Sequence, residues 1–446
     1  MDDVPVDVLE PDTQAGTAPF GKPSAPRMPP PVLTPWLRAQ AVNVTRHAAA
    51  LRPFRRIEFG TSDAAPSEGH IQAVNRLMES LRGGLLKMTS GVTDAAAAAS
   101  KNPTARQLQE TVTRKEHAHR MVEAIERIWD FYFELFGQRQ GQYAEWLLSC
   151  DRIALDCYRV TYTGLGTARS VPAPPPFSYM RTGFAPATFR RGIPLTRLGK
   201  QLNPFPLVQL PYHRLVNPWT LGAVLHEVSH NLHSDLGLTR DIPRRIADRL
   251  LKAGCGRFVA SVWTRWNREM FADMSALLLG GPCVIGTVMD VVGRGPETVL
   301  TFNPQGVHPT PYFRTLINLE MLRRMGFGDV AEQFRRAWKR IYPNPAAGDI
   351  PRSLLESFGE ASALAVDAMC FRPFPTLGNK SLAQVIPFQP KEQTMIEEAG
   401  HRLAAGTDPG IVPERFLIGA VRFALDSRLA EPEALAKNFY LELGRR

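Results

Sequence analysis

Apolar residues recur every three or four positions along much of the chain, which is the spacing of one face of an α-helix. In residues 66–165 this spacing places five apolar side chains on one side of a predicted helix: Val122, Ile125, Ile128, Phe131 and Leu135. Residues 346–446 show the same spacing. The pattern predicts one helical region before the middle of the chain and another after it.

Shorter patterns interrupt the helical spacing in the middle of the chain. The proline-rich stretch SVPAPPPFSYM at residues 170–180 predicts a break between domains. Further on, Val208 and Leu210 stand between Pro206 and Pro211. This arrangement predicts a short edge strand, because proline is tolerated mainly at sheet edges, with an ordinary loop as the alternative. The expected fold is therefore α+β and mostly α-helical, with a small sheet.

Two apolar stretches of the middle region are predicted to be helices. The first, NPWTLGAVLHEVSHNLH at residues 217–233, opens with an Asn-Pro pair and is followed by Gly237, a residue type common after helix ends. The second, residues 263–281, places Met270 and Met274 at core spacing. Both helices are expected to lie in the core of the protein.

Composition divides the chain into four expected regions. Residues 1–65 are rich in proline, alanine and charge, which is typical of an extended or disordered segment able to dock a partner. Residues 66–165 form a helical N-terminal region, 166–345 a core domain and 346–446 a helical C-terminal region.

The overall charge is basic. The chain has 446 residues, 44% of them hydrophobic, with 53 Lys and Arg against 43 Asp and Glu, a net charge of +10. Arginine-rich stretches such as residues 334–340 are typical of solvated helix faces. No nucleic-acid-binding signature appears, so a nucleic-acid partner is not expected, although the basic charge does not exclude one.

The sequence predicts neither export nor a membrane span. The N-terminal stretch MDDVPVDVLEPD is acidic and lacks the basic start and apolar core of a secretory signal. The longest uncharged run, residues 274–289, is too short to cross a bilayer. The five cysteines are widely spaced, as is typical of reduced thiols. The expected location is cytoplasmic.

The first of the two core helices carries the pattern H-E-x-x-H at His226, Glu227 and His230. Residues four apart on a helix differ by about 40° around its axis, so the two histidines can ligate one metal ion. Glu227 lies beside them, where it can accept a proton from a zinc-activated water. The pattern predicts a hydrolytic Zn²⁺ site.

A catalytic zinc ion usually has three protein ligands. His233 is a weak candidate because it lies a turn beyond the pair, and it is otherwise expected near the site or in solvent. Glu269 is the better candidate, and Asp273, on the same helix face, can accept a hydrogen bond from the free ring nitrogen of a ligating histidine. Both acids stand in an apolar stretch, where an unpaired carboxylate would be costly to bury. The expected metal ligands are His226, His230 and Glu269.

These motifs resemble those of the gluzincin metallopeptidases, in which H-E-x-x-H is followed on a later helix by E-x-x-x-D. The stretch GVHPTPYFRTLINLEML also resembles the H-P-x-x-x-x-R segment of the prenyl-protease and HtpX-like peptidases, with His308, Pro309 and Arg314 at matching positions. The resemblance covers about residues 205–322. It implies a zincin-like catalytic domain within residues 166–345, and a strand before the first motif that binds extended peptide by strand addition. Many such relatives are integral membrane proteins, whereas this chain has no convincing span.

The expected function is zinc-dependent hydrolysis of peptide or protein substrates. Glu227 is the expected general base and later the proton donor to the leaving amine. His308, Tyr312 and Arg314 are candidates for the donor that stabilises the oxyanion, and spacing does not choose among them. Two alternatives stay open: a non-catalytic zinc-fold scaffold for a protein or acidic partner, and a zinc hydrolase of non-peptide amides. The intact Glu227 argues against the scaffold. No motif predicts the natural substrate, the activation or the oligomeric state.

Overall fold

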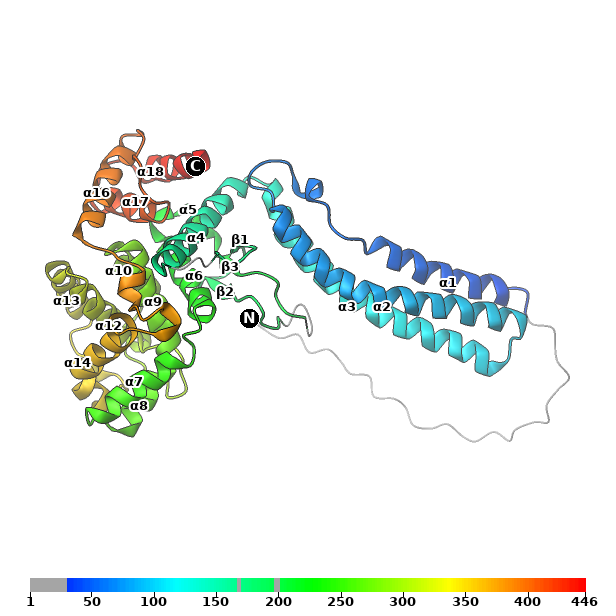
Figure 1. Cartoon of the computed structure of the whole chain (residues 1–446), viewed down its shortest axis with the longest axis horizontal. Helices are drawn as coiled ribbons and strands as arrows, with labels where there is room; N and C mark the ends of the chain where they lie inside the picture. Colours follow the sequence, from blue (N-terminus) through cyan, green and yellow to red (C-terminus); the bar gives the residue numbers. More distant parts are fainter. Residues whose placement is uncertain (1–29, 167–169, 196–200) are drawn as a thin grey trace. The chain divides into compact units, whose positions relative to one another are not determined.

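The computed structural model describes residues 30–166, 170–195 and 201–446 (Figure 1). Within these ranges the chain is mostly helical and contains a small three-stranded sheet. The expected α+β class with a predominance of helix is confirmed. The zincin-like character of the core domain stays a prediction.

The chain divides into two compact units. The first takes in the chain up to Ala48 together with Leu86–His119, and the second consists of Ala49–Leu85 and Arg120–Arg446. The domain boundaries expected near residues 165 and 345 both fall inside the second unit.

Segments of three long helices pack side by side in the first unit (Figure 1). They belong to α1 (Leu33–Ala50), α2 (Glu68–Lys101) and α3 (Ala105–Gly137), of which α2 and α3 continue into the second unit. With α4 (Ala144–Gly164), these helices confirm that residues 66–165 are largely helical.

Helix α1 corrects part of the expectation for residues 1–65. Proline content suggested an extended or disordered segment, but Pro35 lies in the first turn of α1, where proline is tolerated. Leu37, Val44 and Ala48 recur at helical spacing and are fully buried, so they stabilise the helix by packing. Residues 1–29 of that region lie outside the described residues.

The sheet consists of β1 (Phe177–Met180), β2 (Ala187–Phe189) and β3 (Leu207–Leu210) in the order β1-β3-β2. Strand β3 pairs in parallel with β1 and antiparallel with β2. The prediction that this stretch forms a strand is confirmed, but the prediction that it is an edge strand is wrong. Pro206 and Pro211 flank the strand and leave the N–H groups inside it free to pair on both sides.

Two buried helices, α6 (Gly222–Asp235) and α9 (Asn267–Gly280), pack against each other in the second unit. Helix α6 ends just before Gly237, whose φ of 71° is the left-handed conformation that often follows a helix. The predicted helix over residues 263–281 is two helices, because the chain breaks between α8 (Gly256–Arg265) and α9.

Further helices complete the second unit, and the helical character of residues 346–446 is confirmed. They are α5 (Tyr212–Val216), α7 (Asp241–Lys252), α10 (Cys283–Val292), α11 (Pro296–Val299), α12 (Pro311–Arg324), α13 (Gly328–Ile341), α14 (Arg352–Val366), α15 (Leu382–Val385), α16 (Pro390–Ala404), α17 (Phe416–Asp426) and α18 (Pro432–Arg445). Among the described helices, none combines the length and the apolar character needed to cross a membrane.

Candidate metal centre

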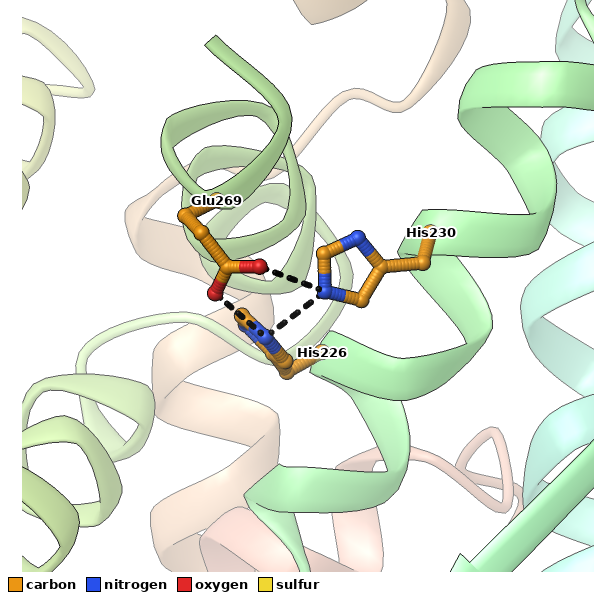
Figure 2. Close-up of side chains that lie close together, drawn as sticks. All are labelled: His226, His230 and Glu269. Atoms are coloured by element: carbon orange, nitrogen blue, oxygen red, sulfur yellow. Dashed lines mark hydrogen bonds and ion pairs between the residues drawn. The ribbon is translucent and has the colours of Figure 1, made fainter. Parts of the chain in front are cut away.

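Helix α6 directs the two histidines of the H-E-x-x-H pattern toward α9 (Figure 2). Leu225, Val228 and Leu232 on α6 are fully buried, and their packing fixes the rotation of the helix. The Nε2 atoms of His226 and His230 lie 3.1 Å apart. The four-residue spacing therefore brings both rings to one point.

Helix α9 supplies a carboxylate to the same point. Glu269 Oε2 lies 3.5 Å from His226 Nε2, and Glu269 Oε1 lies 3.4 Å from His230 Nε2. Figure 2 shows the three side chains pointing toward one another from the two helices. Among the described residues, these three form a cluster whose donor atoms all lie within 4.8 Å of one another.

The geometry of the cluster fits a zinc ion. Ligand atoms about 2.0–2.2 Å from a tetrahedral zinc ion are roughly 3.4 Å apart, and the donor atoms here are separated by 3.1, 3.4 and 3.5 Å. Two imidazoles and one carboxylate also form a donor set that catalytic zinc ions use. Three protein ligands would leave a fourth position for water or substrate.

Asp273 lies one turn beyond Glu269 and contacts a histidine of the cluster. Its Oδ1 lies 2.7 Å from His226 Nδ1, the ring nitrogen that faces away from the other donor atoms. A proton held on Nδ1 leaves Nε2 as the nitrogen for a metal ion. Burial raises the pKa of Asp273, but the charges and hydrogen bonds of Arg314 and His226 outweigh it and hold the pKa well below its usual range. Asp273 is therefore a carboxylate.

Helix α12 fixes the position of Asp273. Arg314 donates from Nε to Asp273 Oδ2 at 2.7 Å and from Nη2 to Oδ1 at 2.8 Å, and Asn318 donates to Oδ2 at 2.9 Å. Asn318 was not predicted from the sequence. Its four-residue spacing from Arg314, which places both on one face of a helix, is a signal that could have found it.

The charges of the cluster depend on burial and on neighbouring groups. Burial lowers the pKa of His226, but Asp273 and Glu269 outweigh it and raise the pKa to about 10. Burial and the charge of His226 lower the pKa of His230 to about 3. Burial raises the pKa of Glu269, but His226, Arg314 and His230 together lower it to about 2. Glu269 and Asp273 are thus carboxylates at neutral pH, and a metal ion would displace the proton from His226 Nε2.

Glu227 lies beside the cluster without a partner. Its side chain is buried, and among the described residues it forms no hydrogen bond or ion pair. Burial raises its pKa to about 7, with a contribution from the charge of Glu269. A carboxyl group with a pKa near neutrality is well suited to accept and return a proton.

A cavity of about 720 Å³ adjoins the cluster. It is lined by β2 and the residues around it, by α6, by the first two turns of α9 and by α10. Residues of α8, of α12 and of the loop before α12 complete the lining. The predicted site residues among its lining are His226, Glu227, His230, Glu269, Asp273, His308 and Arg314. The structure therefore brings these seven side chains to one cavity.

The three predicted oxyanion donors differ in position. The His308 side chain is 62% exposed, and its Nε2 lies 3.5 Å from Glu269 Oε1. Arg314 also lines the cavity, but its guanidinium is held by Asp273. Tyr312 is buried in the hydrophobic core and is not among the described residues that line the cavity. It lies two positions, or about 200° around the helix, from Arg314. The structure does not support Tyr312 as a catalytic residue.

His233, the weaker candidate for the third ligand, does not join the cluster of donor atoms. Its ring stacks on Phe271 with 4.5 Å between the ring centroids, and it is only 2% exposed. Of its two other expected positions, the one in solvent is therefore wrong and the one near the site is right. It lines the same cavity, as do Arg190 and Arg268, which the sequence did not single out.

Comparisons of the chain with protein-family models, with curated proteins and with solved structures find no match. The interpretation of the site rests on its own geometry.

Proposed function

We propose that the protein is a zinc-dependent metallopeptidase. The observation that carries the proposal is the triangle of donor atoms from His226, His230 and Glu269 with a buried, unpartnered Glu227 at its side. The resemblance of the two sequence motifs to those of gluzincins supports the same conclusion. A buried carboxyl without a partner costs free energy, and a purely structural zinc site would have no use for it.

The residues around the cluster have distinct roles in the proposed reaction. Zinc, when bound, would act as a Lewis acid and make water more acidic. Glu227 accepts a proton from the attacking water and later gives it to the leaving amine, and a pKa of about 7 suits both directions. His308 is the best-placed donor to the oxyanion, because it is exposed on the cavity wall. Arg314 positions Asp273 and Glu269.

Strand β2 is the proposed binding edge for an extended substrate. Among the described residues it pairs only with β3, so its second edge is free to add a strand. Ala187 and Thr188 of this strand line the cavity beside the cluster. A strand edge next to the cavity favours a peptide over a small amide. Strand addition is thus proposed for β2 in place of β3.

A cytoplasmic location is part of the proposal. All five cysteines lie within the described ranges, and none is in a disulfide. Free thiols of this kind are typical of proteins in a reducing compartment.

The proposal is tested with the purified full-length chain. We expect about one zinc ion per chain by elemental analysis, and hydrolysis of a mixed peptide library that stops when a chelator removes the metal. Glu227→Gln should retain zinc but slow hydrolysis by orders of magnitude, because only proton transfer is lost. The exposed Glu433→Gln is the matched control and should remain active. A zinc-loaded chain that cleaves no peptide, or a fully active Glu227→Gln variant, would overturn the proposal.

A further inference from the structure

The cavity has a basic end formed by Arg190, His233 and Arg268. Arg190 directly follows β2, His233 lies in the last turn of α6, and Arg268 lies in the first turn of α9. These residues come from three elements that also position the candidate metal centre. They are therefore part of the same site.

The two arginines have no counter-ion within bonding distance. Among the described residues, neither side chain forms a hydrogen bond or an ion pair. Burial lowers the pKa of Arg190, and the nearby charge of Arg268 lowers it further. Asp235 partly offsets that charge, but its carboxylate already accepts a hydrogen bond from Tyr158. Two like charges on one cavity wall thus lack a bonded anion.

His233 adds an unsatisfied polar atom to this end. Its Nε2 is buried and has no hydrogen-bond partner within the described part of the chain. A buried polar atom of this kind requires an explanation, and a bound anion is one, because the neutral ring would donate to it with its proton on Nε2. Burial, together with the charges of Arg268 and Arg190, lowers the pKa of His233 to about 4, so the ring is neutral at pH 7. The two arginines thus give the basic end two positive charges, which the nearby Asp235 partly offsets.

The opposite end of the cavity is apolar. Gly222, at the start of α6, packs so closely on α10 that a Cβ there would lie 2.5 Å from Thr287 Oγ1. Helix α10 therefore closes this end and lines it with valines, including Val284 and Val288. The metal ligands lie between the apolar end and the basic end.

Measured along α6, the basic end lies about one helical turn from the proposed metal ligands. His233 lies three residues beyond His230, about 4.5 Å along the helix axis. One residue of an extended peptide spans about 3.3 Å. A group bound at the basic end would thus lie one or two residues from a peptide bond held at the cluster.

We propose that Arg190, His233 and Arg268 form a carboxylate-binding subsite, so that preferred substrates carry a carboxylate one or two residues from the cleaved bond. This inference rests on the proposed peptidase function. The carboxylate is an Asp or Glu side chain or the C-terminus of the peptide, since guanidinium groups bind both in the same way. A phosphate is less well matched, because the nearby Asp235 repels its charge of about −1.5 to −2 more strongly than the single charge of a carboxylate.

The first experiment measures kcat/KM of the zinc-loaded protein with matched peptides. The peptides differ only by Glu or Gln at each position within two residues of the cleaved bond, or by a free or amidated C-terminus. We expect a preference of about 10- to 100-fold for one carboxylate form, the gain typical of a charge-assisted hydrogen bond. A preference for Glu over Gln would identify a side chain as the bound carboxylate, whereas a preference for the free over the amidated end would identify the C-terminus.

Arginine variants test whether the preference arises at this subsite. Arg190→Gln and Arg268→Gln should each reduce the ratio of kcat/KM between the carboxylate peptide and its neutral counterpart. Arg257→Gln on α8 is the control, because Arg257 is exposed and lies outside the cavity lining. The control should keep the full ratio.

A binding measurement separates this proposal from the proposed function. Isothermal titration of the Glu227→Gln variant, with and without zinc, should show tighter binding of the carboxylate peptide, and the arginine variants should lose this difference. That result supports the subsite even if no peptide is cleaved. Cleavage at equal rates with and without the carboxylate would overturn the subsite and leave the peptidase function intact. A phosphoserine peptide that outcompetes the Glu peptide would also overturn it.

Discussion

Replacing Asp273 by asparagine tests the network behind the proposed metal ligands with little change in side-chain shape. The Oδ1 atom lies 2.7 Å from His226 Nδ1 and accepts from Arg314, while Oδ2 accepts from Arg314 and Asn318. Each carboxylate oxygen thus accepts from two donors. In the asparagine variant, the NH₂ group would face two donors in either orientation of the amide and could accept from neither. Breaking a buried charge pair in this way costs about 3–5 kcal/mol, so the metal-free variant should unfold at clearly lower denaturant concentration.

The same change should weaken zinc binding. His226 loses the carboxylate that holds its ring, and Arg314 is left with Glu269, whose Oε2 lies 3.3 Å from the guanidinium. The guanidinium then competes with the metal for a ligand. Loss of such a supporting contact usually lowers metal affinity about 10- to 100-fold, or about 1.4–2.7 kcal/mol. Competition with a chromophoric chelator measures this affinity.

A double variant makes the reasoning refutable. Asp273→Asn with Arg314→Gln removes the competing guanidinium, so it should bind zinc at least as tightly as Asp273→Asn alone. Asp290→Asn is the control, because Asp290 is exposed and pairs with Arg422 away from the cavity. Unchanged zinc affinity in Asp273→Asn would show that the network does not support the metal ligands, and additive losses in the double variant would refute the competition.

Further substitutions test the individual roles. Glu269→Ala should abolish tight zinc binding in the chelator assay, whereas His233→Ala should retain it. An equal loss of zinc affinity in both variants would show that His233 is a ligand. His308→Ala should keep zinc but lower kcat by roughly 10- to 1,000-fold, and unchanged kcat would exclude it as the oxyanion donor. Burial lowers the pKa of His70 from 6.5 to about 4. Between these pH values the folded state binds fewer protons than the unfolded state. The free energy of unfolding should therefore fall by about 3 kcal/mol as pH falls from 6.5 to 4. In denaturant unfolding, the free energy of unfolding of His70→Gln should fall less over this pH range than that of the wild type or of the exposed His117→Gln. Identical pH profiles for the three proteins would contradict this.

The sequence predicted which residues of the candidate metal centre share a face of the same helix. Helical spacing alone places His226 beside His230, and Glu269 on the same face as Asp273, because residues four apart lie one turn apart. The pairing of α6 with α9 did not follow from spacing. It was expected because Glu269 and Asp273 stand in an otherwise apolar stretch, and the resemblance to a known family supported it. Local periodicity predicts which side chains share a face, but not which faces meet.

Contacts distant in sequence account for the errors. The central position of β3 depends on its pairing with β1 and β2. The sequence of the strand itself does not predict which strands it pairs with. Arg190 and Arg268 belong to different elements and have no spacing in common. Tyr312 is different, because two positions along a helix are enough to turn its side chain away from that of Arg314. Helical spacing alone could have excluded Tyr312 from the face that carries Arg314.

Helix α6 links the proposed chemistry to the proposed specificity. Successive turns of this one helix carry Gly222 at the apolar end of the cavity, His226 and His230 at the candidate metal centre, and His233 at the basic end. A helix rises by about 1.5 Å per residue, so the number of residues between two positions on α6 sets their spacing along its axis. This spacing separates the cluster from the proposed subsite. We therefore expect a substitution at His233 or Arg268 to alter which peptide is bound without moving the proposed metal ligands. In the proposed function, the H-E-x-x-H pattern would specify the reaction, and the residues one turn beyond it would specify the substrate.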